Sequence, residues 1–353
     1  MKTIAIVAGG DSSEYEVSLR SAKGLSGFID NERYRLYTVL MRFGKWTVVL
    51  PDESPEIDKN DFSFQSNGQK IKFDYAYITI HGRPGEDGRL QGYFDMLGIP
   101  YSSCGVLASA LTFNKYINNR YLKAHGVRIA NSILLPHSPF EGGQGDVISS
   151  SPFEGGQGDV KLGVQGDVIS SSPFEGGQGD VIKLPVFVKP TTSGSSFGIS
   201  KVKDPSQLRP AIEKAFSEGN EVIIESFIEG TEVTCGCYKT KTKQVVFPVS
   251  EVIPDNEFFD YNAKYNGQVQ EITPARLPGE LAKAIQQETL RIYDLIGAKG
   301  LIRIDYIIPA DNHPVLLEVN TTPGMTETSF IPQQIKAAGL DIKDVMTDII
   351  ENL

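Results

Sequence analysis

Near its carboxyl end the chain reads LIRIDYII at residues 301–308 and VLLEVN at residues 315–320. Both segments are rich in branched apolar residues and alternate in polarity, so each predicts a β-strand. The six residues between them begin and end with proline and contain Asp311 and Asn312, which favours a turn. We therefore expect an antiparallel hairpin, and the polar residues inside such apolar strands mark it as a candidate functional site.

Four polar side chains share one face of this hairpin. A symmetric turn sets Asp305 opposite Glu318 and Arg303 opposite Asn320. Two facing carboxylates repel each other, so we expect a cation between them, and two carboxylates with an amide oxygen suit Mg²⁺. The alternative is a solvated face on which Arg303 forms an ion pair with Asp305. The apolar character of both strands favours the metal site, because acids placed there need a partner to coordinate.

The composition limits the kind of protein. A length of 353 residues predicts two or three domains with a cleft between them. A formal net charge of −10 without a long basic run argues against a nucleic-acid partner. No apolar run approaches the ~20 residues that a membrane span needs. The three cysteines do not suggest a disulfide framework and the amino terminus lacks a secretory cleavage site, so we expect a cytoplasmic protein.

The pattern of predicted elements divides the chain into three parts and gives the fold class α/β with α+β elements. Residues 1–114 alternate strand-like and helix-like segments, which favours a parallel sheet with helices on its faces. Residues 115–232 begin with a helix-like segment and continue with short strands. Residues 233–353 contain a long helix-like segment and the hairpin. We expect these parts to be an N-terminal substrate-binding domain, a central domain and a C-terminal catalytic domain.

A glycine-rich repeat interrupts the central part between residues 138 and 182. The sequence SPFEGGQGDV begins at Ser138, Ser151 and Ser172, and a partial copy occupies residues 165–168. Each copy has only one or two apolar anchors, too few to stack into a shared core, so we predict a flexible linker or insertion. No copy follows a strong strand or carries its own lysine in register, which argues against a phosphate-binding loop.

Three further loops follow predicted strands. Lys189 ends a strand and precedes a loop of small residues up to Gly198, in which backbone N–H groups could approach an anion closely. The loop at residues 81–88 lies where ligands of open α/β sheets bind. Glu14 and Glu16 follow the first strand in the same way, although either could be an acid at a helix start that interacts with the helix dipole.

Six motifs, taken together, resemble those of the D-alanine–D-alanine ligases, which are members of the ATP-grasp superfamily. In chain order they are GGDSSEYEVS at 9–18, HGRPGEDGRLQG at 81–92, KP with GSSFG at 189–198, DY with AKY at 260–265, RID at 303–305 and EVNTTPGMT at 318–326. The resemblance covers nearly all of residues 1–133 and 184–353. It implies a three-domain ATP-grasp architecture with ATP held between the central and C-terminal domains.

The resemblance also implies roles for individual residues at the amino-acid sites. Glu16 would hold the ammonium group of the first D-alanine, with Ser195 and Tyr265 orienting it and His81 nearby. Arg303 and the backbone N–H of Gly324 would stabilise the tetrahedral oxyanion, and Ser329 would bind the carboxylate of the second D-alanine.

At the nucleotide, Lys115 and Lys189 would contact the ATP phosphates and Lys264 the transferred phosphoryl group. Glu225 would meet the adenine and Glu232 the ribose. Asp305, Glu318 and Asn320 would hold two Mg²⁺ ions, or Mn²⁺ in their place.

The implied reaction makes D-alanyl-D-alanine for peptidoglycan synthesis. The carboxylate of the first D-alanine attacks the γ-phosphate of ATP to give an acyl phosphate, and the amine of the second then attacks that carbonyl, so that ADP and phosphate leave. Two alternatives stay open, a ligase that joins D-alanine to D-serine or D-lactate and an ATP-binding homologue without activity. Tyr265 favours D-alanine as the second substrate. The expected partners are two D-alanine molecules, with a homodimer left open.

Overall fold

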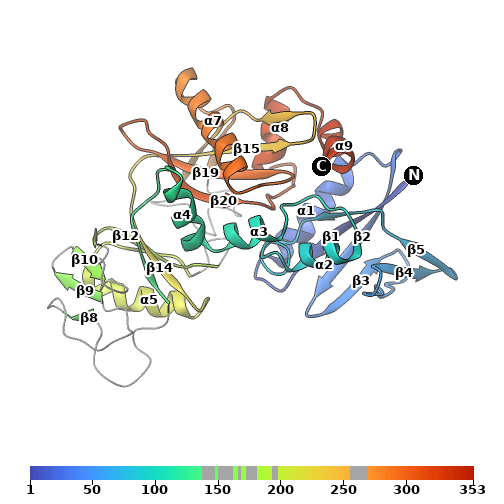
Figure 1. Ribbon diagram of the computed structural model, residues 1–353, viewed down its shortest axis with the longest axis horizontal. Coiled ribbons are helices and arrows are strands. Elements are labelled where there is room, and N and C mark those ends of the chain that lie inside the picture. The colour runs from blue at the N-terminus through green and yellow to red at the C-terminus, as the bar shows by residue number, and fades with distance from the viewer. Residues whose placement is uncertain (137–147, 150–161, 166–167, 172–180, 193–197, 255–268) are drawn as a thin grey trace.

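The computed structural model describes residues 1–136, 148–149, 162–165, 168–171, 181–192, 198–254 and 269–353. Its elements form an amino-terminal sheet, two sheets in the middle of the chain and a carboxyl-terminal sheet, with helices against them (Figure 1). Among the described residues, no helix combines the length and the apolar character needed to cross a membrane.

The amino-terminal sheet has the strand order β3-β2-β1-β6, in which β1 pairs in parallel with both β2 and β6. This confirms the predicted parallel sheet, to which β3 adds one antiparallel edge. The elements of this part are β1 (Lys2–Gly9), α1 (Tyr15–Phe28), β2 (Tyr34–Arg42), β3 (Lys45–Val49), β4 (Ser63–Ser66), β5 (Gln69–Lys72), β6 (Tyr75–Ile78), α2 (Arg89–Leu97) and α3 (Val106–Phe113).

The first strand shows why this sheet forms. Residues 4–8 are all apolar and completely buried, as a central parallel strand covered on both faces requires. The strand ends at Gly9, where φ is +103° and a Cβ atom would lie 2.4 Å from the carbonyl oxygen of Met41. Only glycine fits there, and the chain turns directly into the loop that precedes α1.

The middle of the chain contains an antiparallel sheet of strand order β13-β12-β14-β7, against which α5 packs. Its elements are α4 (Lys115–Ala124), β7 (Ser132–Leu135), β12 (Val186–Pro190), β13 (Ser200–Val202), the 3₁₀ helix η1 (Pro205–Gln207), α5 (Leu208–Phe216) and β14 (Val222–Ser226).

The repeat segment contributes a second small sheet to this part. The strands β8 (Ile148–Ser149), β9 (Leu162–Gln165), β10 (Val168–Ser171) and β11 (Val181–Lys183) lie in the order β11-β10-β9-β8. Leu162, Ile169 and Ile182 are at most 3% exposed and belong to the same core as Val186 and Ile224. The prediction of an unpacked linker is therefore wrong for these strands. The prediction considered only the apolar residues within each repeat copy. Apolar residues between and beside the copies also pack into the central core.

The carboxyl-terminal part is built on an antiparallel sheet of six strands, β18-β17-β15-β19-β20, with β16 paired to β15. Its elements are β15 (Thr231–Lys239), β16 (Gln244–Val246), β17 (Ser250–Pro254), β18 (Val269–Ile272), α7 (Gly279–Leu295), β19 (Ile302–Ile308), β20 (Val315–Asn320), α8 (Phe330–Ala337) and α9 (Ile342–Asn352). The predicted hairpin is β19 and β20.

A shared core joins the two ends of the chain. Ile4 and Leu25 of the amino-terminal part pack in one apolar cluster with Ile331 of α8 and Met346 of α9. Figure 1 shows α8 and α9 above α1 and the amino-terminal sheet. The close approach depends on Gly24 in α1, where a Cβ atom would lie 2.0 Å from the carbonyl oxygen of Met325. The turn after β20 is therefore held against α1.

Candidate active site

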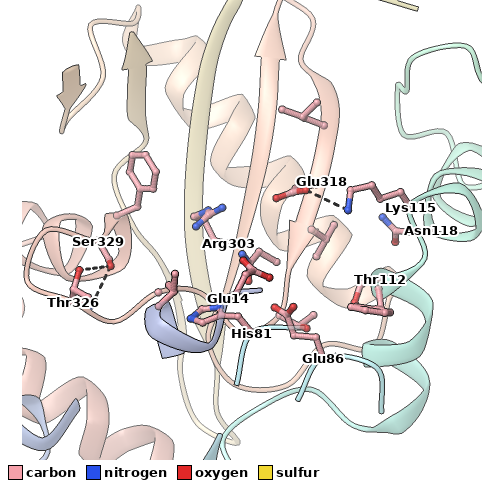
Figure 2. A pocket seen from close by; sticks show the side chains of 18 of the residues that line it. Glu14, His81, Glu86, Thr112, Lys115, Asn118, Arg303, Glu318, Thr326 and Ser329 are labelled. Atoms are coloured by element: carbon pink, nitrogen blue, oxygen red, sulfur yellow. Dashed lines mark hydrogen bonds and ion pairs between the residues drawn. The ribbon is translucent and has the colours of Figure 1, made fainter. Parts of the chain in front are cut away.

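A cavity of about 360 Å³ lies where the three parts of the chain meet. Figure 2 shows side chains from the amino-terminal loops, from α4 and from the hairpin converging on it. The lining residues are Glu14, Val17, Arg20, His81, Glu86, Thr112, Phe113, Lys115, Asn118, Asn119, Glu271, Arg303, Leu317, Glu318, Val319, Asn320, Thr321, Gly324, Thr326, Thr328, Ser329 and Phe330.

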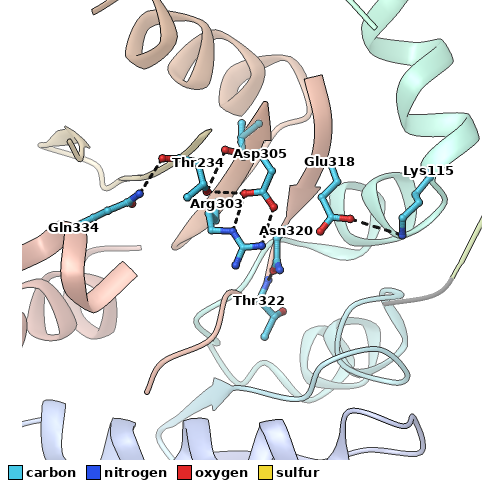
Figure 3. Close-up of polar contacts among 9 residues, drawn as sticks. Lys115, Thr234, Arg303, Asp305, Glu318, Asn320, Thr322 and Gln334 are labelled. Carbon is cyan, nitrogen blue, oxygen red and sulfur yellow. Dashed lines mark hydrogen bonds and ion pairs between the residues drawn. The ribbon is translucent and has the colours of Figure 1, made fainter. Parts of the chain in front are cut away.

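At the site the hairpin has the predicted register, with Asp305 opposite Glu318 and Arg303 opposite Asn320, and the register shifts by one residue between Asp305 and Tyr306. In this structure the two carboxylates are neutralised separately. Arg303 donates to both oxygens of Asp305, from Nε at 2.9 Å and from Nη2 at 2.8 Å. The hydroxyl of Thr234 adds a third hydrogen bond at 2.6 Å (Figure 3). The ion pair considered as the alternative is therefore present, in a buried site rather than on a solvated face.

Glu318 has a different partner. Its carboxylate lies 3.9 Å from Nζ of Lys115, at the start of α4 (Figure 3). Asn320 accepts a hydrogen bond from the backbone N–H of Thr322 at 3.1 Å, which fixes its amide oxygen. Two carboxylates and an amide oxygen on neighbouring strands are the ligands that a hard divalent cation prefers. The donor set fits Mg²⁺, provided that Arg303 releases Asp305 when the ion binds.

Within the described ranges no cluster of three or more His, Cys, Asp or Glu side chains is close enough to hold a metal ion by itself. Any ion at the hairpin must complete its coordination with oxygens from elsewhere. Phosphate oxygens of a nucleotide are the natural source, because Mg²⁺ is usually bound by one or two carboxylates together with substrate phosphates.

The loop after β1 places Glu14, rather than Glu16, at the cavity. Glu14 is 7% exposed and lines the cavity, whereas Glu16 lies in the first turn of α1 with an exposed side chain. Ser12 fixes this loop, because its hydroxyl donates to the carbonyl of His81 at 2.8 Å and accepts from the N–H of Glu14 at 3.2 Å. Glu16, predicted to hold the first D-alanine, is therefore not in the lining of this cavity, and Glu14 is. Glu14 and Glu16 are two residues apart in the sequence, but Glu14 precedes α1 and Glu16 lies within its first turn.

The loop after β6 brings His81 and Glu86 to the same cavity. His81 is 5% exposed and lies 3.4 Å from the hydroxyl of Ser21, and burial lowers the pKa of its imidazole. Glu86 accepts a hydrogen bond from the N–H of Gly82 at 2.7 Å. Burial and the nearby carboxylate of Glu14 raise the pKa of Glu86 to about 8. Near neutral pH this carboxyl is mainly protonated, which limits the negative charge of the cavity.

The turn between β20 and α8 forms another wall. Ser329 lies at the N-terminus of α8, and its Oγ accepts from the N–H of Thr326 at 3.0 Å and lies 2.8 Å from the Thr326 hydroxyl (Figure 2). Gly324 lines the cavity beside it, and a Cβ atom there would lie 3.0 Å from the same Oγ. The first turn of a helix and a glycine backbone together offer N–H groups to an anion.

At the opposite side α4 carries Lys115 and two asparagines into the cavity. The side-chain oxygen of Asn118 is buried and has no hydrogen-bond partner in the described part of the chain. Asn119 donates to Glu225 at 3.0 Å, and Glu225 forms an ion pair of 2.5 Å with Lys189. A buried amide oxygen without a partner beside a lysine is a group that a ligand is expected to satisfy.

The other predicted residues are placed as follows. Lys189 and Glu225 are buried on neighbouring strands, close to the cavity through Asn119 but not in its lining. Glu232 lies on β15 between Ile307 and Val252 and is also outside the lining. Ser195, Lys264 and Tyr265 lie outside the described residues. Sequence reasoning did not select Glu86, Thr112, Asn118, Asn119 or Glu271. Glu86 could have been selected from the sequence, because it lies in the loop that follows a predicted parallel strand.

Comparisons with known proteins agree with this arrangement. Models of the D-Ala-D-Ala ligase N-terminus and C-terminus match residues 3–104 and 174–351. A D-alanine–D-alanine ligase of Parabacteroides distasonis is 60% identical over 352 residues, which cover 99% of this chain and 97% of the relative. The chain belongs to the D-alanine–D-alanine ligase family. Ligases of this family depend on ATP and act on D-alanine.

Solved structures of the family share the fold over almost the whole chain. The VanG D-Ala:D-Ser ligase from Enterococcus faecalis has a TM-score of 0.79 and 29% sequence identity, and the match covers 99% of this chain and 98% of VanG. The D-alanyl-alanine synthetase A from Vibrio cholerae has a TM-score of 0.78 and 25% identity, covering 99% of this chain and 97% of the synthetase. The ATP-grasp architecture is therefore confirmed.

Proposed function

We propose that this chain joins two D-alanine molecules to D-alanyl-D-alanine at the expense of ATP, for peptidoglycan synthesis. The observation that carries the proposal is the cavity itself. It brings a buried acid after β1, a cationic and acidic pair formed by Lys115 and Glu318, and the Arg303–Ser329 wall into one space of about 360 Å³. These groups match the ammonium, phosphate and carboxylate groups of the reactants.

Glu14 is the proposed site for the ammonium group of the first D-alanine. It is the acid that the β1 loop turns into the cavity, and Ser12 holds its backbone in place. His81 lies nearby as a neutral imidazole, because burial lowers its pKa. A neutral ring avoids repulsion with the ammonium group and can still exchange hydrogen bonds. Ser195 and Tyr265 remain proposed as groups that orient this substrate.

The nucleotide is proposed to lie towards α4. Lys115 and Lys189 supply positive charge for its phosphates, and Lys264 contacts the transferred phosphoryl group. Asn118 offers the nucleotide a buried amide oxygen that has no hydrogen-bond partner among the described residues. Glu225 and Glu232 are the proposed contacts to adenine and ribose, which requires Lys189 to exchange its bond to Glu225 for the phosphates.

Asp305, Glu318 and Asn320 are proposed to hold Mg²⁺, two ions or Mn²⁺ in their place. Bound there, the metal would neutralise charge that develops on the phosphate oxygens. Its binding would release Arg303 from Asp305, so that the guanidinium becomes available to the reacting carbonyl.

The wall formed by Arg303, Gly324 and Ser329 is proposed to act on the second half of the reaction. The first D-alanine carboxylate attacks the γ-phosphate, and the resulting acyl phosphate is attacked by the amine of the second D-alanine. Arg303 and the N–H of Gly324 stabilise the oxyanion of the tetrahedral intermediate, and Ser329 binds the second carboxylate. Most of the catalysis is then positioning and electrostatic stabilisation.

We also propose the domain bounds 1–114, 115–232 and 233–353, because residues 1–114 hold the parallel sheet and the hairpin sheet begins with β15 at Thr231, two residues before the last bound. ATP and D-alanine as substrates favour a cytoplasmic location. A homodimer is proposed as the oligomeric state to be tested by light scattering.

D-serine is the second candidate for the amino-acid acceptor. It is favoured by one observation, the match to a structure described as a D-Ala:D-Ser ligase. The test is ADP release by the purified chain with ATP, Mg²⁺ and D-alanine, followed by identification of the dipeptide when D-alanine competes with D-serine or D-lactate. D-alanine-dependent ADP release with D-alanyl-D-alanine as the main product is expected. ATP binding without ADP release would instead support an inactive homologue.

A further inference from the structure

We infer that Glu271 binds the ammonium group of the second amino acid and thereby selects an amino acid over a hydroxy acid at that position. This inference rests on the proposed function and assigns a specificity role to a residue of the same cavity. It concerns the choice of acceptor, and it does not involve the phosphoryl-transfer step.

Glu271 is fixed at the wall where the second amino acid is proposed to bind. It lies on β18 and lines the cavity together with Arg303, Thr328 and Ser329. Gln333 of α8 donates from the same nitrogen to Glu271 at 2.5 Å and to the carbonyl of Thr328 at 2.7 Å. This amide therefore links Glu271 to the residue before Ser329. A carboxylate and the proposed carboxylate-binding hydroxyl are held in one rigid unit, as recognition of an amino acid with two charged groups requires.

The charge of Arg303, once it is released from Asp305 as proposed above, gives such an acid a role. A guanidinium beside the second site attracts the carboxylate of an amino acid but repels its ammonium group, unless an anion lies close by. Burial raises the pKa of Glu271, and the hydrogen bond from Gln333 and the charge of Arg303 oppose this rise. A hydroxy acid such as D-lactate gains less from this anion, because its hydroxyl can donate a hydrogen bond but carries no charge.

The other acids that line the cavity have different positions. Among the described residues they are Glu14, Glu86 and Glu318. Glu14 follows β1 and faces the proposed first substrate, and Glu318 pairs with Lys115 on the nucleotide side. Figure 2 shows Glu86 on the opposite side of Arg303 from Ser329. Glu271 is therefore the acid best placed to meet an ammonium group at the second site.

The test compares wild-type protein with Glu271→Gln, which keeps the size and a hydrogen-bond acceptor but removes the charge. Glu327→Gln is the matched control, because Glu327 is exposed in the same wall, next to Thr328, and does not line the cavity. Steady-state ADP release over a range of D-alanine concentrations gives the KM values of the first and second sites, and D-lactate is added as a competitor. The melting temperature of each variant shows whether it is folded.

For Glu271→Gln we expect the second-site KM to rise about tenfold, the effect of losing one charge-assisted hydrogen bond. The first-site KM, the KM for ATP and the inhibition constant of D-lactate should each stay within about twofold, as should every constant of Glu327→Gln. The preference for an amine over a hydroxyl at the second site then falls about tenfold.

An unchanged second-site KM would overturn the inference. So would an equal loss of affinity for D-alanine and D-lactate, because that pattern marks Glu271 as a structural anchor for α8. If Glu271→Gln does not fold, Glu271→Asp decides, since it keeps the charge and must keep the preference for the amine. Wild-type protein that releases no ADP with D-alanine would refute the proposed function itself, a result distinct from an active enzyme with an unaltered second site.

Discussion

Replacement of Asp305 by asparagine should destabilise the protein without any ligand. Asp305 is 8% exposed, and its carboxylate accepts two hydrogen bonds from Arg303 and one from Thr234. The side chain of Arg303 is only 14% exposed. Asparagine removes the carboxylate to which this guanidinium is hydrogen-bonded, and breaking a buried pair from one side costs about 3–5 kcal/mol.

The amide of asparagine still accepts one hydrogen bond and the cavity admits water to Arg303, so we expect a loss of about 2–3 kcal/mol. At roughly 2–4 °C per kcal/mol for a folding unit of this size, the melting temperature should fall by about 5–10 °C. Glu318→Gln is the matched comparison. Its partner Lys115 lies 3.9 Å away, and the Glu318 side chain is 30% exposed. Such a pair contributes at most about 1 kcal/mol, so the melting temperature should change by less than about 3 °C.

Differential scanning fluorimetry of both variants in EDTA, without nucleotide, measures this difference, and both variants should lose ADP release by at least about 100-fold. The reasoning fails if Asp305→Asn melts at the wild-type temperature or above it. That result would mean that the two facing acids repel each other in the empty site and that Arg303 does not neutralise Asp305.

Three further predictions concern other parts of the chain. In the folded protein the pKa of Glu86 is about 8, whereas in the unfolded chain Glu86 ionises near its ordinary pKa. The free energy of unfolding, measured with urea in the absence of ligand, should therefore fall by about 1–2 kcal/mol as the pH rises from 5 to 8. Glu86→Gln should remove this fall. Ile169→Ala should lower stability by about 2–4 kcal/mol while Val181→Ala, at an exposed position, changes it by less than about 0.5; equal effects would contradict the packing of the repeat strands. Glu14→Gln should raise the first-site KM for D-alanine at least about tenfold, and Glu16→Gln should leave it within about twofold. A larger rise in KM for Glu16→Gln than for Glu14→Gln would mean that Glu16 binds the ammonium group.

Local sequence determined the elements of the hairpin. Alternation of polarity along residues 301–308 and 315–320 set which side chains share a face, and a symmetric pairing correctly predicted Asp305 opposite Glu318. The shift of register by one residue between Asp305 and Tyr306 was not predicted. The buried run in β1 and its terminal glycines predicted a parallel strand in the same way. These features depend on residues close in sequence, whose geometry the strand period controls.

The tertiary structure decided which polar groups become partners. Whether Glu14 or Glu16 enters the cavity depends on where α1 starts against the loop of His81, about seventy residues away. The position of Glu271 depends on an amide of α8, and the burial of Ile169 on strands at both ends of the central part. Each outcome is set by contacts between distant segments, and the order of residues along the chain carries only weak information about such contacts. The sequence by itself therefore specified the chemistry available, and the fold selected which of these groups meet in one cavity.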